Sequence, residues 1–187
     1  MSDKSAPKKK KSPVLEWIIA IAVAVLLAVS IRIFIFEPYV VDGDSMDPTL
    51  KNTEKLFVNK AIHYIGKFDR GDIVIINGKE NKEHYVKRII GLPGDTVEVK
   101  NDVLYVNGKE VKEPYLNSNR KAAQASGLQL TNDFQEVKVP DEKYFVMGDN
   151  RLVSMDSRTG LGLIEADRVI GKSEFVMLPF NKIRATN

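Results

Sequence analysis

The 187-residue sequence contains no cysteine and only two histidines, His63 and His84. The absence of cysteine excludes disulfide bonds, thiolate nucleophiles and thiolate-zinc sites, although it leaves the cellular compartment open. With so few histidines, a dedicated transition-metal site is disfavoured as well. We therefore expect no metal and no organic cofactor, and any nucleophile in this chain must be something other than a thiol.

Positive charge is scarce outside the N-terminus. The formal net charge is +3, and residues 1–13 hold five lysines against one aspartate, so this tail carries +4 and the remaining chain about −1. A nucleic-acid-binding domain needs lysine and arginine clustered on a folded face. We therefore expect no nucleic-acid partner.

One long apolar run follows the lysines. It extends from Val14 to Phe36 and is interrupted only by Glu16, Ser30 and Arg32. As a helix of about 23 residues it would span roughly 35 Å, enough for a hydrocarbon core of about 30 Å. Because lysine-rich flanks stay in the cytoplasm, the chain beyond the run should lie outside the cell.

These features predict three parts. They are a basic cytoplasmic tail over residues 1–13, a single-pass cell-membrane anchor over residues 14–36, and an extracytoplasmic domain over residues 37–187. Ala28-Val29-Ser30 matches the small-x-small pattern of a cleaved secretory signal, which is the alternative. We favour an uncleaved anchor because the strongly apolar RIFIF follows that pattern.

Short strand-like segments separated by turns make up the remaining chain. The stretch DTVEVKNDVLYVNGKEV predicts a three-stranded meander with turns at Asn101-Asp102 and Asn107-Gly108. Residues 117–135 are polar, and we expect an exposed excursion there with a short helix over residues 120–126. The predicted fold class is a mainly β domain of about 150 residues behind a single N-terminal transmembrane helix.

The stretch GDSMDPT contains a serine, Ser45, that is either a nucleophile or a turn residue. A serine hydroxyl needs a base that takes its proton. His63 lies between apolar residues and is more typical of a packed or loop histidine. On a strand EHYVKRII, side chains alternate. His84, Val86 and Arg88 would then share one face, and Tyr85, Lys87 and Ile89 the other.

Lys87 would therefore lie in an apolar setting. Burial disfavours the charged form of an amine and lowers its pKa. A neutral lysine can act as a general base for a serine. A lysine on a strand is nevertheless usually solvated, so these residues alone leave the pair undecided.

Four ordered motifs follow the apolar run, namely GDSMDPTL, RGDIV, VKRIIGLPGD and GDNRLVSMDSR. In this combination the chain closely resembles the bacterial type I signal peptidases, the Gram-positive, Bacillus-like members most of all. The resemblance covers the apolar run and essentially the whole domain after it. It implies a membrane-anchored serine endopeptidase that removes signal peptides from exported preproteins.

The resemblance also implies roles for particular residues. Ser45 matches the nucleophile, Lys87 the general base, and Ser154 the serine that helps to orient this lysine. Four further polar residues match those that brace the site, namely Arg88, Asp149, Asp156 and Arg158.

Two positions depart from the family pattern. Many Gram-negative relatives have a serine two residues before the nucleophile, where its hydroxyl stabilises the oxyanion, and this chain has Gly43. The oxyanion hole would then need the Ser45 amide and another donor. The last motif usually carries polar residues where this chain has Leu152 and Val153.

A tethered, outward-facing peptidase would meet preproteins whose apolar leader still lies in the lipid bilayer. Such leaders end in a small-x-small signal. An extended leader could add as a strand beside Asp42-Gly43 and the Tyr85–Lys87 segment, with main-chain hydrogen bonds. The walls of the pockets for small side chains are predicted to be Val41, Leu50, Tyr85 and Val86.

Three alternatives share some of these features. A self-cleaving repressor-type protease uses the same serine–lysine chemistry, but in the cytoplasm and usually with a DNA-binding domain. In an anchored, non-enzymatic binding module, Ser45 and Lys87 would only pack. A histidine-dependent hydrolase would use His84, as do the endoplasmic-reticulum relatives in which histidine replaces the lysine.

Overall fold

The computed structural model describes residues 13–34, 36–65, 67–79 and 83–186, and the side chains of residues 30–36, 64 and 65 are not among those described. The predicted basic tail therefore lies outside the described residues, apart from Pro13. The chain divides into two units, residues 1–35 and residues 36–187. The first contains helix α1 (Pro13–Phe34), whose large apolar side chains are exposed as far as Val29.

Among the described residues, no helix combines the length and the apolar composition that crossing a bilayer requires. The transmembrane anchor therefore stays a prediction.

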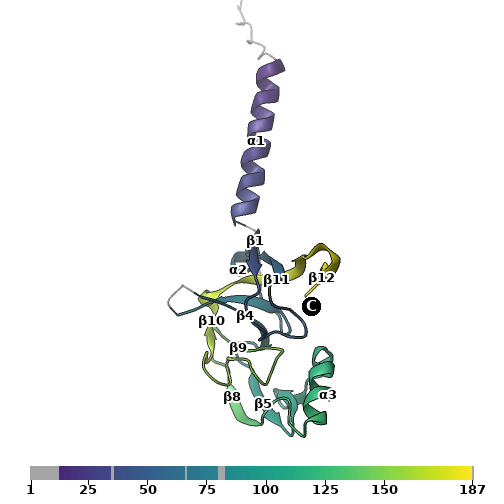
Figure 1. Cartoon of the computed structure of the whole chain (residues 1–187). Helices are drawn as coiled ribbons and strands as arrows, with labels where there is room; N and C mark the ends of the chain where they lie inside the picture. The colour runs from purple at the N-terminus through teal and green to yellow at the C-terminus, as the bar shows by residue number, and fades with distance from the viewer. Residues whose placement is uncertain (1–12, 35, 66, 80–82, 187) are drawn as a thin grey trace, which may run out of the picture. The chain divides into compact units, whose positions relative to one another are not determined.

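The second unit contains two antiparallel sheets (Figure 1). The larger has the strand order β1-β2-β11-β3-β4-β9-β10, with β12 also paired to β11. Its strands are β1 (Phe36–Val40), β2 (Lys55–Asn59), β3 (Ile73–Asn77), β4 (His84–Gly91), β9 (Lys143–Met147), β10 (Ile164–Glu165), β11 (Val169–Leu178) and β12 (Arg184–Ala185). Short helical turns, α2 (Ala61–Ile65), η2 (Ala166–Arg168) and η3 (Phe180–Lys182), connect them.

The smaller sheet has the order β7-β6-β5-β8, built from β5 (Thr96–Lys100), β6 (Val103–Val106), β7 (Lys109–Glu110) and β8 (Phe134–Lys138). The predicted meander is confirmed, because β5 pairs with β6 and β6 with β7. Positive φ values at Asn101, Asp102, Asn107 and Gly108 give both turns the left-handed conformation that two-residue hairpins need.

Strand β4 separates two apolar cores of the larger sheet. Ile75 opposite Val86 belongs to a core with Val41, Met46 and Leu56, which we call the first core. Ile76 opposite Tyr85 belongs to a second core on the other face, with Phe68, Val74 and Ile89. The predicted alternation along β4 therefore holds, since Tyr85 and Ile89 belong to one core and Val86 to the other.

One edge of β4 is only partly covered. Strand β3 pairs with the whole segment from His84 to Arg88, whereas β9 pairs with β4 only from Arg88 onward. Among the described strands, none pairs with His84–Lys87 on the β9 side. This segment can therefore accept an added strand.

The polar stretch over residues 117–135 is not simply an exposed excursion, so that prediction is wrong in part. Helix α3 (Asn117–Ala125) begins three residues before the predicted helix and follows the turn η1 (Pro114–Leu116). Leu116, Ala123 and Leu130 form a small buried core with Tyr115 packed against it. The apolar positions are too few and too widely spaced for a recognisable periodic pattern, which is why the sequence suggested exposure.

Candidate active site

Ser45 lies in the tight turn between β1 and β2, whose position is set by buried apolar side chains. Met46, within the turn, and Leu50, directly after it, are both buried in the first core. Gly43 has a φ of 88°, a conformation that side-chain-bearing residues rarely adopt. This backbone conformation suits the glycine found at this position.

The loop after β9 holds the Ser45 turn from the other side. The Asn150 amide donates to the Ser45 carbonyl at 3.0 Å, and the Asn150 side chain donates to the Asp44 carbonyl at 3.1 Å. Within the described part of the chain, the Ser45 amide donates to no other group. It is therefore free to donate to a developing oxyanion.

The Lys87 amine meets the Ser45 hydroxyl. Lys87 Nζ donates to Ser45 Oγ at 2.7 Å, and Lys87 is only 2% exposed while Ser45 is partly buried. Burial lowers the pKa of Lys87 to about 8, although the negative charges of Asp156 and Asp149 oppose the change. A substantial fraction of the amine is consequently neutral near pH 8, where it can accept a proton.

Arg88, the next residue, enters a different environment. Its guanidinium donates to both carboxylate oxygens of the fully buried Asp149 at 2.9 and 2.7 Å and to the Gly71 carbonyl at 2.7 Å. The Tyr115 ring lies 4.0 Å from the guanidinium carbon, and the Thr49 hydroxyl donates to Asp149. Asp149 thereby joins β4 to the end of the Ser45 turn.

Asp156 and Arg158 form a second bracing pair. Arg158 donates to both oxygens of Asp156 at 2.9 and 2.8 Å, and the Gly148 amide donates to Asp156 at 3.0 Å. Burial raises the pKa of Asp156, but Arg158 and the Gly148 amide outweigh this effect, so the net pKa lies below the usual value. Asp156 therefore remains a carboxylate at neutral pH.

Ser154 does not make the predicted contact. Its hydroxyl is buried and lies near Asp156, whose pKa it helps to lower, but it forms no hydrogen bond with Lys87; the Lys87 amine donates only to Ser45 within the described residues. Its role in orienting Lys87 stays a prediction. Gly148 separates Ser154 from the Ser45 turn, and a Cβ atom at Gly148 would overlap both the Ser154 hydroxyl and the Ser45 carbonyl. Only glycine fits there without displacement of one of them.

A small recess of about 70 Å³ adjoins Ser45 and Lys87. Four predicted substrate-binding residues line it, namely Val41, Asp42, Tyr85 and Val86, together with Tyr39, Met46, Ile75 and His84, which the sequence analysis did not assign to it. The prediction for Leu50 needs correction. Leu50 is fully buried in the first core and is not among the residues that line the recess. Gly43 does not line the recess either, although its neighbour Asp42 does.

The two histidines occupy different positions from the proposed base. His63 lies on α2. His84 is exposed at the start of β4, with its ring edge-on to Tyr39 at a centroid distance of 5.4 Å. The geometry thus favours Lys87 over either histidine as the partner of Ser45.

Sequence reasoning missed several polar contacts of the site. Asn119 donates to the Asp47 carbonyl at 2.9 Å and to the Asp149 carbonyl at 3.4 Å, so α3 reaches both the Ser45 turn and the loop after β9. Thr49 and Tyr115 complete the surroundings of Arg88 and Asp149. Asn150 stands within a motif that was recognised, whereas Asn119 has no local signal that could have revealed it.

The arrangement supplies the parts of an acyl-transfer site. It has a partly buried hydroxyl, an amine of lowered pKa in contact with it, a backbone donor and a small adjoining recess.

Known proteins share this architecture and sequence. Residues 14–178 match the family model described as signal peptidase, peptidase S26. The chain is 61% identical to a signal peptidase I of Bacillus licheniformis over the full length of both. It is 63% identical to signal peptidase I S of Bacillus subtilis (strain 168), with 98% of this chain and 100% of the relative covered.

A solved structure agrees. The crystal structure of a signal peptidase I from Enterococcus faecalis V583 has a TM-score of 0.53 and 39% sequence identity, over 58% of this chain and 97% of that chain. The predicted resemblance is thereby confirmed, and the chain belongs to the signal peptidase family, peptidase S26.

Proposed function

We propose that this protein is a serine endopeptidase that removes signal peptides from exported preproteins, with Ser45 as nucleophile and Lys87 as general base. The observation that carries the proposal is the 2.7 Å contact between Lys87 Nζ and Ser45 Oγ, made by an amine whose pKa burial lowers to about 8. The signal peptidase I relatives support the choice of substrate.

The proposed reaction proceeds through an acyl-enzyme. Neutral Lys87 takes the Ser45 proton while Ser45 Oγ attacks the scissile carbonyl carbon, and the Ser45 amide donates to the oxyanion. The resulting ammonium protonates the leaving amine, so the peptide bond breaks and the new N-terminus departs. Lys87 then deprotonates a water molecule, which hydrolyses the ester and regenerates Ser45.

Bracing residues would keep this geometry rather than react. Arg88 and Asp149 hold β4 against the Ser45 turn through Thr49. Asp156 and Arg158 fix the loop that carries Gly148. We assign these residues and Ser154 a supporting role.

We further propose that residues 14–36 anchor the protein in the cell membrane as a single span, with the basic tail of residues 1–13 in the cytoplasm and residues 37–187 outside. The apolar run in the sequence and the exposed apolar side chains on α1 support this proposal. An exposed Trp17, 72% accessible, suits the membrane interface.

Incubation of the purified full-length protein with a labelled preprotein tests the proposed activity. We expect cleavage after the small-x-small signal that persists in chelator and disappears in Ser45→Ala and Lys87→Ala. Normal cleavage by either variant would refute the assignment of Ser45 and Lys87 as the catalytic pair. A preprotein left intact by folded wild-type protein would favour a non-enzymatic binding module.

A further inference from the structure

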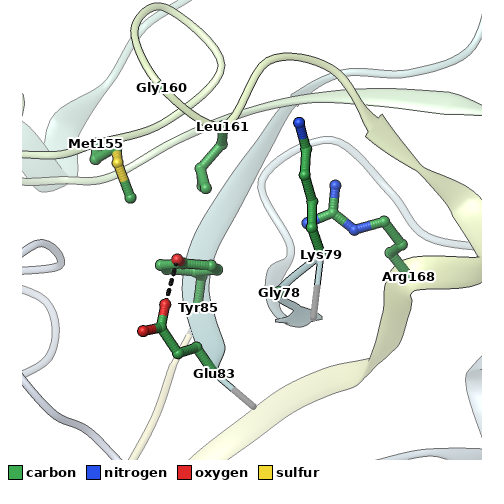
Figure 2. A pocket seen from close by; sticks show the side chains of 8 residues that line it. All are labelled: Gly78, Lys79, Glu83, Tyr85, Met155, Gly160, Leu161 and Arg168. Carbon is green, nitrogen blue, oxygen red and sulfur yellow. Dashed lines mark hydrogen bonds between the residues drawn. The ribbon is translucent and has the colours of Figure 1, made fainter. Parts of the chain in front are cut away.

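A second cavity lies next to the recess at Ser45, on the other face of β4. It has a volume of about 400 Å³, and its lining includes Lys79, Glu83, Tyr85, Met155, Leu161 and Arg168 (Figure 2). Tyr85 is the one lining residue that this cavity shares with the recess. We call the two spaces the large cavity and the small recess.

The two spaces are lined mainly from opposite faces of one sheet. The small recess is lined by Val41, Met46, Ile75 and Val86, all of which belong to or pack on the first core, and at the edge of β4 also by Tyr85 and Lys87. The large cavity is lined by Leu161 and Tyr85, which belong to or pack on the second core. Side chains of paired residues on neighbouring strands point to the same face, and successive residues alternate.

A leader peptide added to the open edge of β4 would therefore divide its side chains between these spaces. The residue before the scissile bond and the residue two positions earlier share one face, and the residue between them points to the other. The recess of about 70 Å³ admits only small side chains, whereas the cavity of about 400 Å³ has room for a long one. Their sizes thus match small-x-small, with x directed to the large cavity.

The charged residues that line the large cavity determine which kind of side chain is favoured at x. Arg168 donates twice to the Asn77 carbonyl, at 3.0 and 2.7 Å, and Lys79 is exposed. Across the described residues, neither cation forms an ion pair with a carboxylate. Among the lining residues that the structure describes, Glu83 is the one acidic residue, and its carboxylate accepts the Tyr85 hydroxyl at 2.7 Å.

We propose that the large cavity binds the middle side chain of the small-x-small signal, and that Lys79 and Arg168 make an acidic side chain the preferred one. The two cations outnumber Glu83, so the cavity has a net positive charge. Figure 2 shows both cationic side chains on the side of the cavity away from Glu83, where a carboxylate can approach them. This inference rests on the proposed function.

The test uses full-length protein in an uncharged detergent and three leader peptides that differ only at x, which is Glu, Gln or Lys. For the wild type we expect kcat/KM to fall from Glu to Gln to Lys, by about two- to fivefold at each step, the range of a solvent-exposed ion pair. The differences should shrink in about 1 M salt, because screening weakens exposed charge pairs.

Charge reversal at an exposed position supplies the decisive comparison. Lys79→Glu should invert the order, so that Lys at x becomes the best substrate. The matched control Lys109→Glu reverses an exposed lysine on β7 of the other sheet and should keep the wild-type order.

Each remaining result has a defined meaning. Equal rates for the three peptides, or an unchanged order in Lys79→Glu, would overturn the proposed cavity role while the cleavage itself still supported the proposed function. Failure of folded wild-type protein to cleave any of the three would overturn the proposed function, and this inference with it.

Discussion

The side chains of two neighbouring cationic residues, Lys87 and Arg88, are buried and project from opposite faces of strand β4. Lys87 is 2% exposed and Arg88 is 4% exposed, yet of the two only Arg88 has a carboxylate against it among the described residues. Arg88 also has the Gly71 carbonyl and the Tyr115 ring, whereas the Lys87 amine meets a hydroxyl, that of Ser45. Burial therefore lowers the pKa of the Lys87 amine, whereas the Arg88 guanidinium has a carboxylate against it that stabilises its charge.

Strand β4 thereby combines a rigid ion pair at Arg88 with a reactive amine at Lys87. The Arg88–Asp149 pair fixes the end of the Ser45 turn through Thr49, which keeps the hydroxyl within reach of the amine. The amine can exchange a proton because Asp149 and Asp156 act on it only through space. A direct carboxylate contact would keep Lys87 charged and remove the base.

Replacing the Lys87 amine by a guanidinium should have the largest effect on activity. Lys87→Arg keeps a buried charge but cannot supply a neutral base, since a guanidinium does not lose its proton in proteins. We expect a loss of at least about 10²-fold in kcat/KM on a leader peptide. Lys143→Arg, at a partly exposed lysine that pairs with Glu165, is the matched control and should cleave normally. Activity near the wild-type value in Lys87→Arg would contradict the assignment of the base.

Removing the partner of Arg88 should strongly destabilise the fold. Asp149→Ala leaves a buried guanidinium without its carboxylate, for which we expect a fall of about 3–5 kcal/mol in the free energy of unfolding. Urea unfolding followed by circular dichroism measures it. The double variant Arg88→Met/Asp149→Ala should recover part of this loss, since no uncompensated charge remains. Equal stability of Asp149→Ala and wild type would show that the pair is not structurally important.

Removing the Lys87 amine, which contacts a hydroxyl and not a carboxylate, should change stability in the opposite direction. The folded pKa of Lys87, about 8, lies below the ordinary value of 10.5, so the unfolded state binds more protons between these values. The resulting penalty is fully present below about pH 8 and disappears as pH rises toward 10.5. Lys87→Met should therefore be more stable than wild type by about 3 kcal/mol at pH 7, and the gain should fade with rising pH. A variant less stable than wild type at pH 7 would refute this.

The smallest effect is expected at His84. His84 lines the edge of the small recess but is exposed, and Lys87 rather than His84 contacts the Ser45 hydroxyl, so His84→Ala should change kcat/KM on a leader peptide by less than about threefold. Complete loss of cleavage with an intact fold would instead favour a histidine-dependent hydrolase.

The sequence predicted those parts of the molecule that have a local or a family signature. Alternation along EHYVKRII correctly separated Lys87 and Tyr85 from Val86, and the Asn-Asp and Asn-Gly turns correctly predicted the meander. The positions of Ser45 and Lys87 followed from ordered motifs, since strand periodicity alone cannot bring together two residues 42 positions apart.

The parts that were missed depend on long-range packing. Asn119 reaches the Asp47 carbonyl across 72 positions, from a helix whose polar sequence suggested exposure. Leu50 was expected to line a pocket, but the tight turn after Ser45 places it in the core. Neither fact has a local pattern, because each depends on how the turn and α3 pack against elements far away in the sequence.

The most direct test of the central claim is an NMR titration of Lys87 in the full-length protein with isotope-labelled lysine side chains. Comparison with Lys87→Met assigns the resonance. We predict a pKa of about 8 for the Lys87 amine, clearly separated from the exposed lysines. A Lys87 that titrates with these lysines, near 10.5, would contradict the account, because Ser45 would then lack a base at physiological pH.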